Sequence, residues 1–430
     1  MKKNRWLIAL SAVMIHLSIG SAYAYSVFKN PLSDSLGWNN KEVALSFTIA
    51  IFFLGASAAV FGRFVEKYGP RKSAIVAAVL FSSGLLGAGL SIQLESLTGF
   101  YLSYGVIGGM GLGIGYISPV STLVKWFPDR RGLATGMAVM GFGAGALICG
   151  PIAARLIESV GISSTFYILG ASYLILMLGG ASYIAKPPEG WMPAKMEKLV
   201  NSGKVVQLKQ DLAYMTANEA VKTKRFWLLW VMMFINISSG IMLISVASPM
   251  AQEKVGMTAA AAAALVGIMG FFNGAGRIGW ASLSDYIGRG NIFIMFFSVQ
   301  LVLFLLLPSI SNVLIFSIFI YIILTMYGGG FASLPAFIGD LFGTKQLGAI
   351  HGYLLTAWSC AGVAGPMAVA AIRDATNSYN ATFYVFAILL VVALLSSILM
   401  KFNIQSIQKQ AESVKPPKGA VPFLKEERSV

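Results

Sequence analysis

Residues 260–280 read AAAAALVGIMGFFNGAGRIGW, a stretch whose one charged residue is Arg277. It has the length and character of a membrane-spanning helix, which needs about 20 apolar residues. A guanidinium at mid-bilayer costs roughly 2.5–3.5 kcal/mol on insertion scales, and arginine does not escape that cost by losing its proton. The sequence places no Asp or Glu at comparable depth in an apolar run. We therefore expect the partner of Arg277 to be a small anion that arrives, binds and leaves.

The composition of the whole chain indicates a membrane protein. Of its 430 residues, 57% are hydrophobic and only 11% are charged, whereas soluble domains have about 25% charged residues. Long apolar runs recur along the chain. We expect twelve membrane spans, near residues 6–28, 43–61, 73–93, 97–120, 132–154, 163–185, 226–250, 258–280, 291–310, 313–338, 348–371 and 380–400.

The positions of the Lys and Arg residues predict the orientation. With the N-terminus in the cytoplasm, 26 of the 32 Lys and Arg residues fall in cytoplasmic segments and five on the outer side. This bias follows the positive-inside rule. We therefore expect a multi-pass protein of the cell membrane with both termini cytoplasmic. The net charge of +15 then reflects topology and contact with anionic lipids, and not nucleic-acid binding.

The chain divides into two similar halves. Gly150-Pro151 in the first recurs as Gly365-Pro366 in the second, and a long polar stretch separates six spans from six. Two such halves are typical of secondary transporters, whose binding sites lie at the midplane between them. We predict two six-helix halves, at residues 1–185 and 226–401. A cytoplasmic central loop at 186–225 would join them, and a mobile cytoplasmic tail would follow at 402–430.

A charged turn joins the second and third spans. Residues 62–72 read GRFVEKYGPRK, and the pattern Glu66-x-x-Gly69-x-Arg71 returns in the second half as Asp285-x-x-Gly288-Arg289. A carboxylate here can cap a helix N-terminus and pair with an arginine across the interface between the halves. The alternative is a solvated charged turn. The repeat favours a conformational latch with four candidate members, Glu66, Arg71, Asp285 and Arg289.

The turn at 62–72 resembles the loop signature of the major facilitator superfamily, with Glu66 where Asp is usual. GSAYAYSVF at 20–28, KWFPDRRG at 125–132 and NEAVKTKRF at 218–226 resemble the oxalate:formate antiporter family, which is related to bacterial monocarboxylate (lactate-type) transporters. The resemblance extends over essentially the whole chain. It implies an all-α membrane fold of twelve helices in two pseudo-symmetric six-helix halves, and transport of a small acid.

The resemblance also assigns candidate binding residues. Asn273 lies one helical turn before Arg277, at a position where monocarboxylate relatives often carry Asp, so Arg277 keeps its charge. Snorkelling of Arg277 to the interface is the alternative. Trp358 stands where oxalate exchangers have a lysine, and Val27 about where animal monocarboxylate transporters have one. The cavity would then carry one fixed positive charge, which suits a monoanion, although ordinary packing also explains Trp358.

Tyr116 and Tyr327 resemble cavity tyrosines of bacterial lactate carriers. Both adjoin glycine-rich runs, Gly328–Gly330 in the case of Tyr327, which let helices approach or bend. A phenol can donate to a carboxylate, but an interfacial or packing role is equally open. His16 and His351 lie within spans and are candidates for proton relay, with His351 preferred because span 11 lines the cavity in this superfamily. The commoner role of such histidines is a hydrogen bond between helices.

We interpret the chain as a proton-coupled carrier of small monocarboxylate anions that works by alternating access. Arg277 would bind the carboxylate, with Asn273, Tyr116, Tyr327 and Trp358 around it. The sequence contains no evident nucleophile–base pair, cofactor loop or metal-ligand cluster, so we expect a monomeric non-enzyme without cofactor. Three alternatives stay open: an anion exchanger of the oxalate:formate type, a membrane sensor built on a transporter fold, and an exporter of amphipathic drugs, which leaves Arg277 unexplained.

Overall fold

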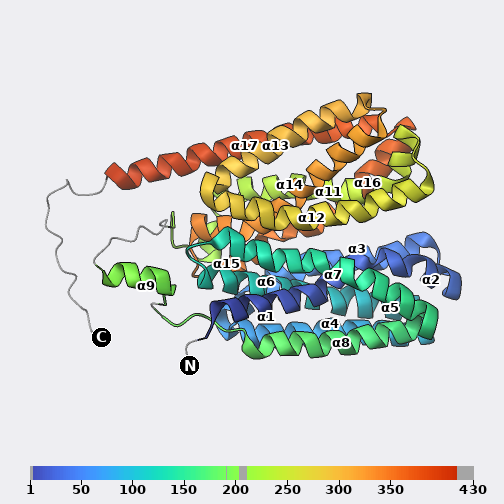
Figure 1. Ribbon diagram of the computed structural model, residues 1–430, viewed down its shortest axis with the longest axis horizontal. Helices are drawn as coiled ribbons and strands as arrows, with labels where there is room; N and C mark the ends of the chain where they lie inside the picture. Colours follow the sequence, from blue (N-terminus) through green and yellow to red (C-terminus); the bar gives the residue numbers. More distant parts are fainter. Residues whose placement is uncertain (1–2, 190, 203–210, 414–430) are drawn as a thin grey trace.

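The computed structural model describes residues 3–189, 191–202 and 211–413. These residues form long helices that lie side by side in two bundles (Figure 1). Within the described chain, twelve helices are long and apolar enough to cross a membrane. The predicted all-α class and the twelve spans are thereby confirmed.

The first bundle holds the helices that precede the central segment: α1 (Arg5–Gly20), η1 (Ser21–Ala24), α2 (Ser26–Leu36), α3 (Asn40–Tyr68), α4 (Pro70–Gln93), α5 (Leu97–Phe100), the π-helical η2 (Tyr101–Gly108), α6 (Gly109–Trp126), α7 (Arg131–Val160) and α8 (Ile162–Tyr183). The central segment contains two short helices, α9 (Ala194–Asn201) and α10 (Ala217–Val221). The second bundle holds α11 (Lys224–Val255), α12 (Ala259–Ile287), α13 (Arg289–Leu306), η3 (Leu307–Ser309), α14 (Val313–Phe342), α15 (Leu347–Leu354), α16 (Thr356–Thr376) and α17 (Asn380–Ser413).

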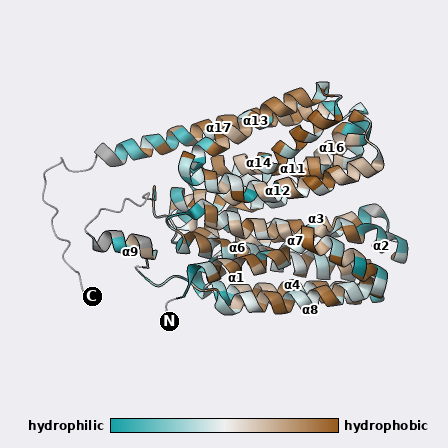
Figure 2. Cartoon of the chain, viewed as in Figure 1, coloured by the Kyte–Doolittle hydropathy of each residue, from teal (hydrophilic) through white to brown (hydrophobic). Residues whose placement is uncertain are grey.

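Several helices extend beyond the predicted apolar runs at both ends. The run at 43–61, for example, lies inside α3, which spans Asn40–Tyr68. Figure 2 shows apolar residues along the bundles and hydrophilic ones at both ends, of which one carries the N-terminus and α9. We call this end the loop end and the opposite one the far end. A hydropathy run marks only the part of a helix that lipid would cover, because backbone hydrogen bonding continues into the polar turns.

The last helix differs from the sequence-based expectation. We predicted a tail from residue 402, yet α17 continues through that position to Ser413, and Ile404 packs against the core. Residues 402–413 contain no proline or glycine, so nothing in them stops a helix that is already formed. The rest of the expected tail, 414–430, lies outside the described residues.

The two halves repeat the same turn at equivalent places. Gly69, between α3 and α4, has φ 84° and ψ 168°; Gly288, between α12 and α13, has φ 88° and ψ 143°. L-residues with a side chain rarely adopt a positive φ of this kind. The repeated glycine in the two charged turns therefore reflects a shared backbone conformation and places Glu66 and Asp285 alike.

The bundles meet along two seams, α3 against α15 and α16, and α7 against α12 and α14. Glycines allow close approach on the loop-end side of both seams. A Cβ at Gly352 would overlap the carbonyl oxygen of Ala58, and one at Gly132 would overlap that of Ala281. Ser359 Oγ also donates to the Phe52 carbonyl across the first seam at 2.9 Å. The halves are therefore held together most tightly toward the loop end.

The seam predicts a test of packing. Gly352→Ala should lower the thermal unfolding midpoint of the purified protein, because overpacking against rigid backbone costs typically about 1–3 kcal/mol. Gly267→Ala on α12 is the matched control, since a Cβ there meets no atom within 4 Å. Replacing that helical glycine should leave the midpoint unchanged or slightly raised. Equal shifts in the two variants would contradict the close seam.

Candidate functional site

Arg277 lies inside the protein, between α12 and α7, with 1% of its surface exposed. Its Nη1 donates to the Val139 carbonyl of α7 at 2.7 Å, and its Nε donates to Asn273 Oδ1 at 3.4 Å. None of the ion pairs among the described residues includes Arg277. The guanidinium thus points across the interface between the halves and does not snorkel. A buried cation held only by neutral acceptors pays a desolvation penalty that an anion could offset.

Polar groups with unused hydrogen-bonding capacity surround this cation. The hydroxyls of Tyr23, Tyr116 and Tyr327 and the indole N–H of Trp358 are buried and have no hydrogen-bond partner in the described structure. The hydroxyls of Tyr23 and Tyr327 lie close together without the geometry of a hydrogen bond, and Arg277 acts electrostatically on all three tyrosines. Each such group costs about 1–3 kcal/mol when left unsatisfied. A ligand rich in acceptors would satisfy them together.

Aromatic rings form the walls of the site. Phe142 and Phe331 lie 5.7 and 6.0 Å from the guanidinium carbon of Arg277, within range of cation–π attraction. The Trp358 ring lies 4.5 Å from that of Phe331 and 5.4 Å from that of Tyr116. Because these rings are apolar, they suit a ligand that has one charged end and a small apolar remainder.

Small residues and a local irregularity in one helix position these side chains. A Cβ at Gly240 would overlap the Tyr327 ring, and one at Gly328 would overlap the Asn273 backbone. Span 11 tightens locally at Leu355, between α15 and α16. The backbone stays in the right-handed helical region there, and the Leu355 N–H still donates to the His351 carbonyl at 2.9 Å. His351 and Trp358 lie on either side of this local irregularity along the helix.

The rings of both histidines lie close to the Tyr116 ring. His16 stacks on it at 5.1 Å, and the His351 ring is 5.8 Å away. Both ring nitrogens of His16 face carbonyl oxygens, Nδ1 that of Ala138 at 2.8 Å and Nε2 that of Tyr116 at 3.1 Å. A neutral imidazole can donate to only one of them, whereas a protonated ring donates to both. Both nitrogens of His351 are buried without a partner.

At the loop end, two carboxylates reach across the interface and cap helices of the opposite half. Glu66 of α3 accepts from the Gly348 N–H at the start of α15 at 2.8 Å. Asp285 of α12 accepts from the N–H groups of Gly132 and Leu133 at the start of α7, at 2.9 and 3.1 Å. Carboxylates are favourable at helix N-termini, so the internal repeat produces two reciprocal caps. We call these two contacts the loop-end gate.

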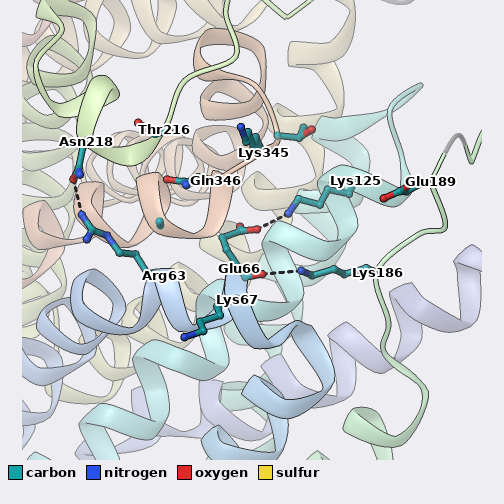
Figure 3. Close-up of a pocket in the computed structure, with 12 residues that line it drawn as sticks. Arg63, Glu66, Lys67, Lys125, Lys186, Glu189, Thr216, Asn218, Lys345 and Gln346 are labelled. Atoms are coloured by element: carbon teal, nitrogen blue, oxygen red, sulfur yellow. Dashed lines mark hydrogen bonds and ion pairs between the residues drawn. The ribbon is translucent and has the colours of Figure 1, made fainter. Parts of the chain in front are cut away.

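The cation partners of the gate differ from the expected pairing with an arginine of the opposite half. Glu66 pairs with Lys125 of its own half at 2.8 Å (Figure 3), and Asp285 pairs with Arg289 one turn away at 2.5 Å. These cations sit at neighbouring helix ends within each half. Arg71 is exposed and takes part in none of the ion pairs among the described residues.

Sequence reasoning missed the ion pair that does cross the interface. Arg131 of α7 lies 3.0 Å from Asp340 of α14 and 2.5 Å from Asp211 of the central segment. Asp340 also lies 3.3 Å from Arg289, so the network joins the gate. The internal repeat could have indicated this pair, because it makes the segment that begins at Asp340 equivalent in sequence to the segment that begins at Lys125. Tyr23 lies within the motif GSAYAYSVF at 20–28 but was not predicted as a site residue. Phe142 and Phe331 could not be identified from the sequence, because hydropathy does not distinguish one apolar residue of an apolar helix from the next.

The centre thus combines one buried cation, neutral donors and apolar rings, and the loop-end gate joins the two halves. A small anion would satisfy the cation and the donors together. No group of His, Cys, Asp and Glu residues suited to a metal ion occurs among the described residues.

Comparison with known proteins supports the resemblance seen in the motifs. The sequence pattern of the Major Facilitator Superfamily matches residues 9–366. An oxalate:formate antiporter from Oxalobacter formigenes is 30% identical over 90% of this chain and 88% of the relative. Monocarboxylate transporter 2 of Rattus norvegicus is 24% identical over 98% of this chain and 88% of the relative. The solved structure of the transporter FucP, in an outward conformation, matches with a TM-score of 0.68 at 13% identity, covering 91% of this chain and 98% of that one.

The gate predicts a change in accessibility. Ser121 lies beside Gly348 and is buried, so a cysteine there, in a chain with Cys149 and Cys360 replaced by serine, reports opening at the loop end. Asp285→Asn should speed thiol labelling of Ser121→Cys about tenfold, since weakening charged hydrogen bonds by about 1.5 kcal/mol has that effect. Glu253→Gln, which breaks the pair with Arg373, is the control. Unchanged labelling in Asp285→Asn would show that the cap does not hold the halves together.

Proposed function

We propose that this chain, which belongs to the Major Facilitator Superfamily and is a multi-pass membrane transporter, carries small monocarboxylate anions. Transport would proceed by alternating access. The observation that carries the proposal is the buried Arg277, which points across the interface with only neutral acceptors on its guanidinium. The names of two relatives, an oxalate:formate antiporter and a monocarboxylate transporter, support the same substrate class.

Binding and closure are linked through the charge of Arg277. A bound carboxylate neutralises the guanidinium and accepts from Tyr23, Tyr116 or Tyr327, whose hydroxyls lack partners. The loaded site then exposes less uncompensated charge to the low-dielectric interior when the halves rock. A ligand can shift such an equilibrium only by its difference in affinity for the two states. Neutralisation of a buried cation supplies that difference.

The site suits an anion of charge one. Trp358 stands at the position where a lysine could pair with the second carboxylate of a dianion. Its ring instead lies against those of Phe331 and Tyr116. The aromatic walls favour a short apolar remainder such as the methyl group of acetate or lactate. Oxalate, with a second carboxylate, would leave one charge facing apolar rings.

We propose His16 as the proton-carrying residue if transport is coupled to protons. Its two nitrogens face two carbonyl oxygens, an arrangement fully satisfied only by the protonated ring. Arg277 acts electrostatically on His16, so the empty site repels a second positive charge. An anion bound at Arg277 removes that repulsion, which makes binding of anion and proton cooperative. His351, whose nitrogens lack acceptors, would act as an intermediate donor beyond Tyr116.

The loop end is proposed to face the cytoplasm of the cell membrane, because the Lys and Arg residues concentrate there. Anionic lipid contact and a monomeric state stay predictions. The second candidate function is exchange of two anions, as the name of the 30%-identical antiporter states for that protein. The absence of a carboxylate partner for Arg277 among the described residues is compatible with exchange, which needs no proton carrier.

Arg277→Gln should abolish saturable uptake of labelled lactate or acetate into proteoliposomes, with a fall of at least about tenfold, while folding stays intact. Arg277→Lys should also fail, because an ammonium cannot reproduce the planar fork of donors. Arg373→Gln, at an exposed pair with Glu253, is the control. Full transport by Arg277→Gln would overturn the binding site, and a wild-type protein that takes up no short acid would favour the sensor alternative.

Monocarboxylates should bind at least about tenfold more tightly than oxalate in calorimetry at neutral pH. The reason is that the site presents one fixed cation, so a second carboxylate has no partner. Trp358→Lys is expected to narrow this difference where the cavity has room for the new side chain. Equal affinities for oxalate and lactate in the wild-type protein would contradict the single-charge argument.

An imposed pH gradient, acidic outside, should accelerate uptake in the wild-type protein and should do so much less in His16→Gln. In His351→Gln, the acceleration of uptake by the pH gradient should fall by less than in His16→Gln. Uptake that responds equally in wild type and in the double variant would exclude a histidine relay. If the rate of uptake does not depend on the pH gradient but rises when the vesicles contain anion, the protein is an exchanger and not a proton symporter.

A further inference from the structure

A hollow of about 890 Å³ lies at the loop end, and Arg277 is not among its lining residues. Figure 3 shows side chains from α3, α6 and the segment after α8 on one side, and from α10 and the α14–α15 turn on the other. Its volume falls in the range of about 300–1,000 Å³ typical of small-molecule sites. Because its walls come from both halves, its shape depends on the halves being together.

The lining carries an excess of positive charge. Five cations and two carboxylates line the hollow: Arg63, Lys67, Lys125, Lys186, Lys345, Glu66 and Glu189. Both oxygens of Glu66 are already engaged, with the Lys125 ammonium and the Gly348 N–H, each at 2.8 Å. Formal charge in the lining is therefore +3 before any ligand binds.

The remaining contacts of these cations do not neutralise them. Arg63 donates to the Asn218 amide oxygen at 2.5 Å, and Lys186 donates to the main-chain carbonyl of Glu66 at 2.7 Å. Both acceptors are uncharged. Glu219, near Lys345, already accepts from the N–H and hydroxyl of Thr216, and these hydrogen bonds lower its pKa. The hollow thus offers several charged donors to one incoming anion.

We propose that this hollow binds a phosphate-bearing polyanion, which bridges Lys186, held against α3, and Lys345 of the second half and keeps the loop-end gate closed. A polyphosphate or phosphomonoester carries several charges and many acceptor oxygens, as the lining requires, whereas a monocarboxylate does not. The ligand would be either a soluble phosphate compound or the phosphate headgroup of a lipid. Separation of the halves would pull the two lysines apart, so the ligand favours the closed state. This regulation rests on the proposed alternating access.

The test is calorimetric titration of the full-length protein, in phosphatidylcholine nanodiscs, with inorganic tripolyphosphate at physiological salt. We expect saturable binding, an affinity at least about tenfold lower in Lys186→Gln/Lys345→Gln, and little change in Lys72→Gln. Lys72 is an exposed lysine of α4 at the same end but does not line the hollow. Absence of saturable binding, or equal losses in the pocket and control variants, would overturn the site.

Nanodiscs that contain phosphatidic acid distinguish the two sources. A lipid ligand would compete and weaken tripolyphosphate binding, whereas a soluble ligand would bind as before; either outcome supports the polyanion site. Tripolyphosphate should also slow thiol labelling of the Ser121→Cys reporter several-fold, and unchanged labelling would refute the closing effect. None of these measurements uses a transported acid, so a wrong substrate assignment would leave their outcome intact.

Discussion

The positive charge of Arg277, buried between α12 and α7 without a carboxylate among the described residues, is the constraint on which the centre of the protein depends. The Val139 carbonyl and Asn273 hold the guanidinium in place but do not neutralise it. Phe142 and Phe331 shield it from solvent, and tyrosine hydroxyls without partners surround it. A small anion would neutralise the guanidinium and would accept hydrogen bonds from these hydroxyls, two needs that the described residues leave unmet.

The same helices carry the site and the loop-end gate. α12 bears Arg277 in the centre and Asp285 two turns further on; α7 bears the Val139 carbonyl and, at its start, the amides that Asp285 caps. A rigid-body movement of α12 against α7 would alter both contacts at once. Such a shared element is a physical basis for coupling between anion binding and opening. Glu66 and α15 repeat the cap on the other seam, so the two-fold repeat of the sequence is also a two-fold repeat of the gate.

Much of this could be predicted, for reasons that particular residues illustrate. A helix that crosses the bilayer needs about 20 consecutive apolar residues, so the twelve spans could be identified from the sequence. The i, i+4 spacing of Asn273 and Arg277 predicted one helix face, and the two side chains are in contact. The repeated Gly69 and Gly288 predicted equivalent turns. Phe142 and Phe331 could not be singled out, because hydropathy does not say which face of a fully apolar helix meets the cavity. The helical end of α17 was missed because polar composition alone does not end a helix.

The sequence by itself determined the all-helical membrane class, the twelve spans, the internal repeat and the presence of one deeply placed cation, because each follows from local composition, periodicity or spacing. Only the tertiary structure decided the partners: Lys125 for Glu66, Asp340 for Arg131 and Arg289, and the Tyr116 ring for both histidines. Those contacts depend on how each helix is rotated and how closely it approaches its neighbour. Rotation and approach are set by interdigitating side chains from distant parts of the chain, and no single stretch of sequence encodes them.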